Sequence, residues 1–440
     1  MPRLVLQKKR MIPRPRIDDQ PMTGETSLPR KMWTRPSRHL AGILCYLIAT
    51  FLATGQSQTG NKRSAPEIER QADSAREKGD VPAALRLYHR ALLQDPRWQQ
   101  GWWYYGSLLY DSNRYPEAAV ALRRLVGFNP KLGGAWALLG LSEFETQDFD
   151  HALNHLQRAK DVGIGDSESL ANVADFHLAI LLNTHGEFER ARALFSSLLL
   201  RGVNSEDLQV GMGMNLLRVP LLPSQLDPSK DALVHDAGNI AALIAKKQFD
   251  QADAGFRQLL SKYPATHFAH YAYGGMLASH GQEDLAKAQF REETNLTPDS
   301  ALPYMESAFL ESKAAGYHDA LPLAKKAVEL APNSFVAHYL LGEALLATGS
   351  IPASVTQLEV ARRLAPDSPE VRYSLSRAYA KAGQSERARN ERMEFAKLRA
   401  GTQRKPREGD ELMRPSNDES ATPPFDPSPT DLSPKDPAPR

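Results

Sequence analysis

The chain has 440 residues, of which 42 % are hydrophobic and 24 % are charged. This composition supplies enough apolar side chain for a large core and excludes a wholly disordered chain. The single cysteine, Cys45, excludes a disulfide framework and a thiolate metal cluster within the chain, because each needs at least two cysteines.

The net charge of +2 conceals a basic front end. Residues 1–39 carry ten Lys or Arg against three acidic residues, a balance of +7, so the rest of the chain sums to −5. A mildly acidic remainder argues against a groove that binds phosphates. We therefore expect no nucleic-acid partner.

An uncharged apolar run, LAGILCYLIATFLA, spans residues 40–53, with Arg35 and Arg38 before it and small or polar residues after it. This is the layout of a secretory signal peptide, and the run is shorter than the roughly twenty residues of a membrane-spanning helix. We expect residues 1–55 to form a basic leader and signal peptide, cut before Gln56, and the protein to be exported to the periplasm or secreted. The alternative is an uncleaved anchor in the inner membrane, which would be the chain's membrane contact.

The start of translation has two candidates within this leader. The segment that begins at Met32, MWTRPSRHLAGILCYL, has a short basic region followed by the apolar run, so it forms a complete signal peptide by itself. Translation from Met1 would instead add a long basic tail. We expect the start at Met32, with Met1 as the alternative.

A period of 34 residues organises the rest of the chain. It separates Pro96 from Pro130 and relates four later prolines, at 264, 298, 332 and 366. A fixed period of this length in helix-forming sequence predicts stacked helical hairpins. Numbering each unit so that its proline is position 32 makes position 20 small in all nine units: Ala84, Ala118, Ala152, Ala191, Ala252, Ala286, Ala320, Ser354 and Ala388.

Three other positions support the hairpin. Position 8 is small except at Ile240, while position 24 is large and apolar in most units, so the two helices can approach closely around a filled core. Position 15 is glycine in five units, where the first helix must end and turn: Gly79, Gly186, Gly281, Gly349 and Gly383. The proline at position 32 then ends the second helix.

The units WWYYGSLLY from Trp102 and WALLGLSEF from Trp136, followed by Ala118 and Ala152, resemble the tetratricopeptide repeat family. The resemblance extends over nine units, about residues 65–400. It implies an all-α fold, a right-handed superhelical solenoid of about nine helical hairpins. Three residues depart from the family pattern: Ile240 at a small position, Glu293 where a small apolar residue is expected, and Arg372 where an aromatic residue is usual.

The register of the repeat breaks twice. About five residues are added around Gly163 and Gly165, and a larger insert with three prolines occupies residues 206–232. This insert either bends the solenoid or joins two arrays, units one to four at 65–205 and units five to nine at 233–400. Residues 401–440, with nine prolines and few apolar residues, predict a disordered tail.

No catalytic, cofactor or metal site is indicated. His151 and His155 share a helix face, but HALNH lacks the glutamate of a zinc protease and no third ligand is near. The glycines of GMGMN, residues 211–215, lack the lysine of a phosphate loop. We expect a protein that is not an enzyme. The alternative is a hydrolase or transferase whose site lies at the insert and the adjoining groove, because active sites form from residues distant in sequence.

The resemblance implies a concave groove lined by the first helix of each hairpin, with positions 2, 5, 9 and 12 facing ligands. These positions are rich in large apolar side chains, which often carry binding energy. The candidates for partner binding are Trp103, Tyr110, Phe144, Tyr271, Met305, Phe309, Tyr339 and Tyr373. The competing interpretation is that the rings pack against the next unit.

We expect a protein or peptide partner, bound as a segment in this groove by a scaffold or adaptor of the cell envelope or secreted space. Position 5 is never Lys and position 9 is never Asn in the six clearest units, which argues against the carboxylate clamp of some chaperone-binding family members. A self-assembling structural protein is the other alternative.

Overall fold

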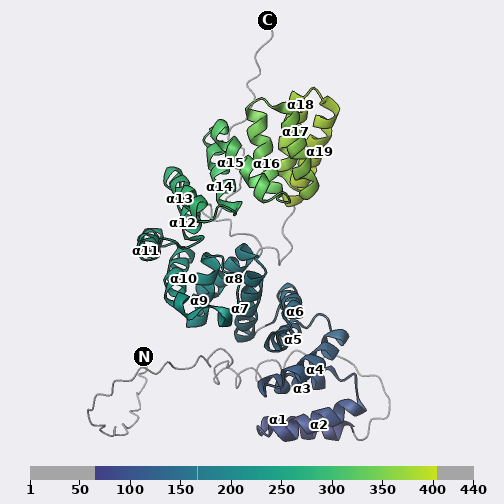
Figure 1. Ribbon diagram of the computed structural model, residues 1–440. Coiled ribbons are helices and arrows are strands. Elements are labelled where there is room, and N and C mark those ends of the chain that lie inside the picture. Colours follow the sequence, from purple (N-terminus) through teal and green to yellow (C-terminus); the bar gives the residue numbers. More distant parts are fainter. Residues whose placement is uncertain (1–64, 166, 404–440) are drawn as a thin grey trace, which may run out of the picture. The chain divides into compact units, whose positions relative to one another are not determined.

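The computed structural model describes residues 65–165 and 167–403 (Figure 1). These ranges hold nineteen α-helices and two 3₁₀ turns, with no strand among them. The predicted leader, signal peptide or anchor, the two candidate starts, and residues 404–440 of the predicted tail lie outside the described residues, so these predictions stay predictions.

Nine helical hairpins account for eighteen of the described helices, as the 34-residue period predicts. The first four are α1 (Ala65–Glu77) with α2 (Val81–Gln94), α3 (Gln99–Asp111) with α4 (Tyr115–Phe128), α5 (Gly133–Glu145) with α6 (Phe149–Val162), and α7 (Glu168–Thr184) with α8 (Phe188–Leu200). The other five are α10 (Asp231–Ala245) with α11 (Phe249–Lys262), α12 (Ala269–Ser279) with α13 (Glu283–Leu296), α14 (Leu302–Lys313) with α15 (Tyr317–Leu330), α16 (Phe335–Ala347) with α17 (Ile351–Leu364), and α18 (Pro369–Lys381) with α19 (Ser385–Gln403). The fold is the predicted all-α solenoid.

Every hairpin turns through a left-handed residue at position 15. The five predicted glycines have φ between 71° and 84°. The other four units reach the same conformation, with φ between 58° and 64°, at Asn113, Gln147, Lys247 and Ala315. Asn visits this region readily, whereas Gln, Lys and Ala disfavour it, so the turns at Gln147, Lys247 and Ala315 are held by the rest of the hairpin.

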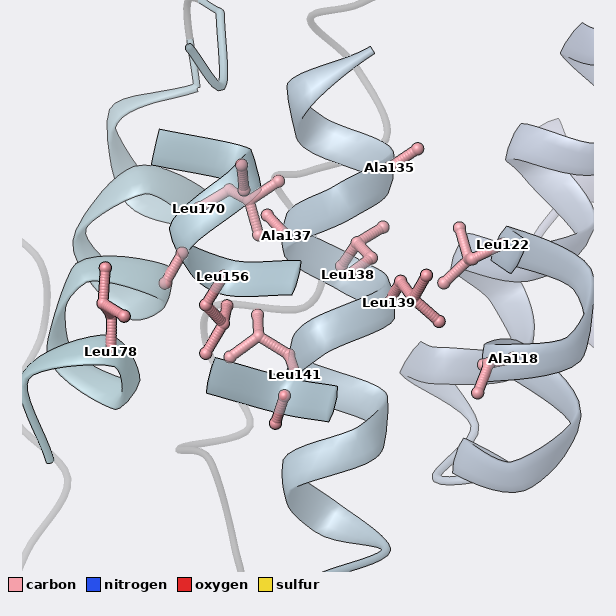
Figure 2. Close-up of a cluster of buried hydrophobic side chains, with 14 of the residues drawn as sticks. Ala118, Leu122, Ala135, Ala137, Leu138, Leu139, Leu141, Leu156, Leu170 and Leu178 are labelled. Atoms are coloured by element: carbon pink, nitrogen blue, oxygen red, sulfur yellow. The ribbon is translucent and has the colours of Figure 1, made fainter. Parts of the chain in front are cut away.

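The core depends on close helix contact at position 8. A methyl group at Gly140 would lie 2.7 Å from Cγ of Leu156, and one at Gly342 would lie 2.6 Å from Cγ of Leu358. Each partner is the position 24 residue of the same unit, so the small and large positions are complementary as predicted. In Figure 2, buried side chains from α4 and from α6 and α7 converge on α5.

Ile240 departs from this pattern, and the structure compensates for it on the other helix. A methyl group at Gly255 of α11 would lie 2.9 Å from Cγ1 of Ile240. Gly255, at position 23, therefore leaves the space that a small residue at position 8 leaves in the other units. Ile240 fills this space and is only 3 % exposed.

The predicted insert is largely structured. It holds α9 (Glu206–Leu216), two 3₁₀ turns at Pro223–Gln225 and Pro228–Lys230, and the start of α10 at Asp231, two residues before the predicted start of unit five. α9 shares its side chains between two core clusters: Leu208 and Met212 pack with the N-terminal units, and Val210 and Met214 with the following ones. α9 is therefore packed against units on both sides of the insert.

The contact between α9 and α10 is backbone against backbone. A methyl group at Gly213 would lie 2.0 Å from the carbonyl oxygen of Val234, and one at Gly238 would lie 2.2 Å from that of Gln209. Both positions thus require glycine for the helices to approach. At the other end of the arrays, α19 continues to Gln403, three residues beyond the predicted boundary at residue 400.

Candidate binding surface of the first helices

All eight candidate residues lie on first helices of the hairpins, but they are not equally accessible. Trp103 is 8 % exposed and Tyr339 is 6 % exposed, so both side chains are buried. This burial favours the packing role that the sequence left open for them, and it removes them from the candidate surface. The remaining six side chains are half-buried, and we name them the stripe: Tyr110, Phe144, Tyr271, Met305, Phe309 and Tyr373.

The N-terminal part of the stripe consists of two sets of rings in edge-to-face contact. Tyr110 contacts Tyr115 edge to face, with ring centroids 5.4 Å apart. Phe144 contacts Phe149 at 5.4 Å and His177 at 4.7 Å in the same way. Burial raises the pKa of Tyr110 and lowers the pKa of His177, so both side chains are kept uncharged at neutral pH.

Two carboxylates follow these rings at position 13 of their units. Burial raises the pKa of Asp111 to about 6 and also raises the pKa of Glu145. The negative charges of both carboxylates contribute to the raised pKa values of Tyr110 and Tyr115, so the two carboxylates lie near both tyrosines. The first helices of units two and three thus end beside desolvated acidic groups.

The middle of the stripe is Tyr271, which contacts residues of α14 and of the insert. Its hydroxyl donates to Oε1 of Glu306 at 3.4 Å, and its ring lies 5.5 Å from the guanidinium carbon of Arg218. Arg218 comes from the insert, lies 4.5 Å over the ring of Phe188, and has Nη1 3.3 Å from Oε1 of Glu189.

Burial is the largest influence on the pKa of Glu306, the hydrogen-bond partner of Tyr271. Burial raises the pKa of Glu306 to about 7, the hydrogen bond from Tyr271 lowers it, nearby Glu189 raises it, and Arg218 lowers it. The repeat pattern did not identify Arg218, because the residue lies outside the 34-residue register and reaches Tyr271 only through the fold.

The C-terminal part of the stripe combines apolar side chains with an ion pair. Met305 and Phe309 of α14 pack on the core cluster that contains Tyr339. Tyr373 lies 5.5 Å from the ring of Phe395 and 5.8 Å from the guanidinium carbon of Arg377.

Glu343 of α16 and Arg377 of α18 form the ion pair, with Oε2 and Nη1 3.1 Å apart. Both residues stand at position 9 of their units, one of the positions expected to face ligands, although neither was among the predicted site residues. Their place at position 9 is the sequence signal that identifies them.

The histidine pair on α6 is engaged in structural contacts. Nδ1 of His155 lies 2.5 Å from Oε2 of Glu143, a buried carboxylate that also accepts from Nη2 of Arg123 at 2.7 Å. Nδ1 of His151 lies 2.8 Å from Oδ1 of Asp148. Among the described residues, no group of three or more His, Cys, Asp or Glu side chains is arranged to hold a metal ion.

Family models described as tetratricopeptide repeat match residues 69–132 and 310–369, and another matches residues 240–266. A search of the curated proteins finds no match.

Solved structures with a similar fold include MamA from Desulfovibrio magneticus RS-1, with 18 % identity, coverage of 39 % of this chain and 98 % of that one, and a TM-score of 0.37. They also include YrrB, described as a TPR protein with an unusual peptide-binding site, with 18 % identity, coverage of 39 % and 89 %, and a TM-score of 0.35. The 34-residue period, the nine hairpins that follow it and the matching family models identify the chain as a tetratricopeptide repeat protein.

Proposed function

We propose that this protein is a protein-binding scaffold that holds a segment of its partner along the first helices of its hairpins. The observation that supports this proposal is the stripe, in which six large side chains on five first helices remain half-buried rather than fully packed. Such side chains offer a large contact area at a low entropic cost, and stacked hairpins hold them in fixed positions.

The test compares stripe variants with a matched surface variant. The mature chain, residues 56–440, would be used for affinity capture from the native envelope fraction as the wild type, as Phe309→Ala with Tyr373→Ala, and as Leu285→Ala. Leu285 is 52 % exposed on α13, a second helix, so it controls for the loss of an apolar surface side chain. We expect one or two stoichiometric partners that the stripe variant loses and the control keeps.

Equal capture by the stripe variant and the control would refute this placement of the site. Melting of each variant, followed by circular dichroism, checks that the losses do not come from unfolding. Capture of nothing except the protein itself would instead favour the self-assembling alternative.

Export to the periplasm or secretion is a separate part of the proposal, and it rests on residues 1–55. None of the described helices is long and apolar enough to cross a membrane. N-terminal sequencing of the protein from fractionated cells tests the proposal: a start at Gln56 supports cleavage, and an intact apolar run in the membrane fraction supports the anchor. Sequencing of an unprocessed precursor distinguishes Met1 from Met32.

In the insert that was the alternative place for a catalytic site, the side chain of Asn215 is used in packing. Nδ2 of Asn215 donates to Oδ1 of Asn183 at 3.1 Å and to the carbonyl oxygen of Phe188 at 2.8 Å. Nδ2 of Asn183 in turn donates to the carbonyl oxygen of Val219 at 2.7 Å. These bonds fasten the insert to unit four.

A further inference from the structure

The exposed faces of two second helices, α2 and α4, are basic and apolar at once. Arg86 and Arg90 of α2 and Arg124 of α4 are exposed, and none of them has a hydrogen-bond or ion-pair partner among the described residues. A single exposed apolar side chain needs no explanation. Of the eight large hydrophobic residues that are exposed in the described chain, however, three lie on these two helices: Leu93, Val120 and Phe128.

The repeat turns these side chains in one direction. Arg90 and Arg124 both stand at position 26 of their units, and Arg86 and Val120 both stand at position 22. Consecutive units of a repeat array are stacked copies, so equal positions point the same way. Residues four or seven apart lie on one side of a helix, which places Leu93 on the same side of α2 as Arg86. We name this set the outer patch: Arg86, Arg90, Leu93, Val120, Arg124 and Phe128.

A groove of about 480 Å³ shows that α2 and α4 share one surface. Arg86 and His89 line it from α2, Tyr105 lines it from α3, and Arg114 and Glu117 line it from the start of α4. The rings of His89 and Tyr105 lie 5.9 Å apart. The outer patch is therefore one continuous surface.

Acidic residues are confined to the ends of these two helices. α2 contains none, and Asp80 and Asp95 are its N-cap and C-cap residues. The acidic residue of α4 is Glu117 in the first turn, where Oε1 accepts from Nε of Arg114 at 2.9 Å. The middle of both helices thus carries a positive charge with which no acidic side chain of the described chain pairs. The net negative charge of the chain after residue 39 conceals this local excess.

The apolar side chains distinguish between two anionic partners, an acidic protein segment and a lipid surface. Both would attract the arginines. Leu93 is 71 % exposed and Val120 is 59 % exposed, so neither helps to form a pocket that would hold a side chain of a protein segment. The interface of a bilayer removes such side chains from water without any pocket, while arginines beside them contact the head groups.

The place of the outer patch in the chain also favours a membrane. The predicted signal peptide or anchor, residues 40–53, precedes α1 by eleven residues, 54–64, which span at most about 40 Å. Units one and two are therefore the units nearest in the sequence to the predicted membrane segment.

We propose that the outer patch docks on a membrane surface of anionic lipids. Arg86, Arg90 and Arg124 contact the head groups, and Leu93 and Val120 enter the interface. The inference goes beyond the proposed function, because the outer patch lies on second helices and the stripe lies on first helices. It assigns the chain a second partner, a lipid surface, whose binding does not depend on the stripe.

Sedimentation with vesicles tests the proposal. Residues 56–440 contain every described residue and lack the apolar run at 40–53, so that run cannot contribute to binding. Vesicles of phosphatidylglycerol and phosphatidylcholine in equal amounts are compared with vesicles of phosphatidylcholine alone. We expect much tighter binding to the anionic vesicles, and weaker binding when salt is added, because ions screen exposed charges.

The variant with Arg86→Gln, Arg90→Gln and Arg124→Gln should bind the anionic vesicles about a hundredfold more weakly, about fivefold for each cation removed. Its matched control loses three exposed cations from the second helices of later units and should bind nearly as the wild type: Arg291→Gln, Lys325→Gln and Arg363→Gln.

A second pair of variants tests the apolar side chains. Leu93→Ser with Val120→Ser should weaken binding to the anionic vesicles about tenfold. The control, Leu285→Ser with Leu364→Ser, removes side chains that are 52 % and 41 % exposed on other second helices, and it should bind as the wild type. Melting of each variant, followed by circular dichroism, checks that the fold is kept.

Three results would overturn the proposal. The first is a wild type that does not bind the anionic vesicles, and the second is an arginine variant that binds them as tightly as its control does. The third is binding of soluble polyglutamate through the same arginines with no loss in the Leu93→Ser, Val120→Ser variant, which would assign the outer patch to an acidic protein. Each of these results leaves the scaffold function standing, because the stripe is unchanged in every variant.

Discussion

The side chain of Arg372 donates two hydrogen bonds to the carbonyl oxygen of Pro366, from Nε at 3.0 Å and from Nη2 at 2.8 Å. This links position 4 of unit nine to position 32 of unit eight. The same link recurs at 2.9 Å in other units, between Trp102 and Pro96, Trp136 and Pro130, and His338 and Pro332. In these four units the side chain at position 4 supplies an N–H that reaches the proline carbonyl, and Arg372 does so without an aromatic ring.

Loss of this donor alone should weaken the junction between two units. We expect Trp136→Phe, which keeps a ring and removes the indole N–H, to lower the free energy of unfolding by about 1 kcal/mol more than Trp98→Phe does. Trp98 is a suitable control because it packs on Tyr88, with ring centroids 5.8 Å apart, and its indole N–H donates to no described residue. Urea unfolding measures both losses, and equal values would show that the hydrogen bond contributes nothing.

Glu293 is the second departure from the family pattern, and it caps a helix. Its carboxylate is fully buried and accepts from the main-chain N–H groups of Phe268 at 2.8 Å and Tyr271 at 3.0 Å, at the start of α12. Phe268 is itself left-handed, with φ 62°. The first turn of α12 thus finds its acceptor in the helix that follows it.

Substitution of Glu293 should be destabilising even though it restores a small apolar residue. We expect Glu293→Ala to lower the free energy of unfolding by about 2 to 4 kcal/mol, because two main-chain donors lose their acceptor. Glu292→Ala, on the exposed side of the same helix, should change it by less than about 0.5 kcal/mol. A stabilised Glu293→Ala variant in urea unfolding would mean that the repeat pattern outweighs the cap.

The repeat pattern predicted the hairpins well because each unit must solve the same packing problem. The small position 8, the large position 24 and the turn at position 15 are local requirements, and they recur with the period. The pattern failed where a requirement was met by an unexpected residue. Ala315 turns as Gly281 does, and Gly255 supplies the space that Ile240 removes.

The candidate site was less predictable, because exposure depends on contacts between units. Periodicity placed Trp103 and Tyr373 at the same position, yet Trp103 is buried and Tyr373 is half-buried. The contact of Arg218 with Tyr271 and the pair of Glu343 with Arg377 join residues that are 53 and 34 positions apart in the printed sequence. The 34-residue period could not predict the contact of Arg218 with Tyr271, because Arg218 lies in the insert, outside the register of the repeat.

The crossing of α9 and α10 should be intolerant of a single methyl group. Gly213→Ala would place Cβ 2.0 Å from the carbonyl oxygen of Val234, and main chain cannot yield as a side chain can. We expect a loss of about 3 kcal/mol or more, since the two helices must separate. Gly275→Ala is the control: a methyl group there meets nothing within 4 Å, so we expect a gain of up to about 1 kcal/mol from helix propensity. Melting temperatures that shift in the same direction in the two variants would contradict the requirement for glycine at the contact between α9 and α10.

The carboxyl of Glu306 should make stability depend on pH in a predictable direction. Its pKa is raised from 4.5 to about 7, chiefly by burial, with Tyr271 and Arg218 lowering it and Glu189 raising it. The folded state therefore holds this proton more tightly than the unfolded state, and the contribution of Glu306 to stability falls as pH rises from about 4.5 to about 7.

Glu306→Gln, which is neutral at every pH, isolates that contribution. Its free energy of unfolding should equal that of the wild type near pH 4.5 and exceed it by about 1 to 3 kcal/mol at pH 8, where the wild type must keep a desolvated carboxylate. Urea unfolding across this pH range measures the difference in free energy of unfolding. For the exposed substitution Glu292→Gln, this difference should not change with pH. If the variant were less stable than the wild type at pH 8, the prediction would be wrong. The attraction of the ionised Glu306 to Arg218 would then outweigh the cost of desolvating its carboxylate.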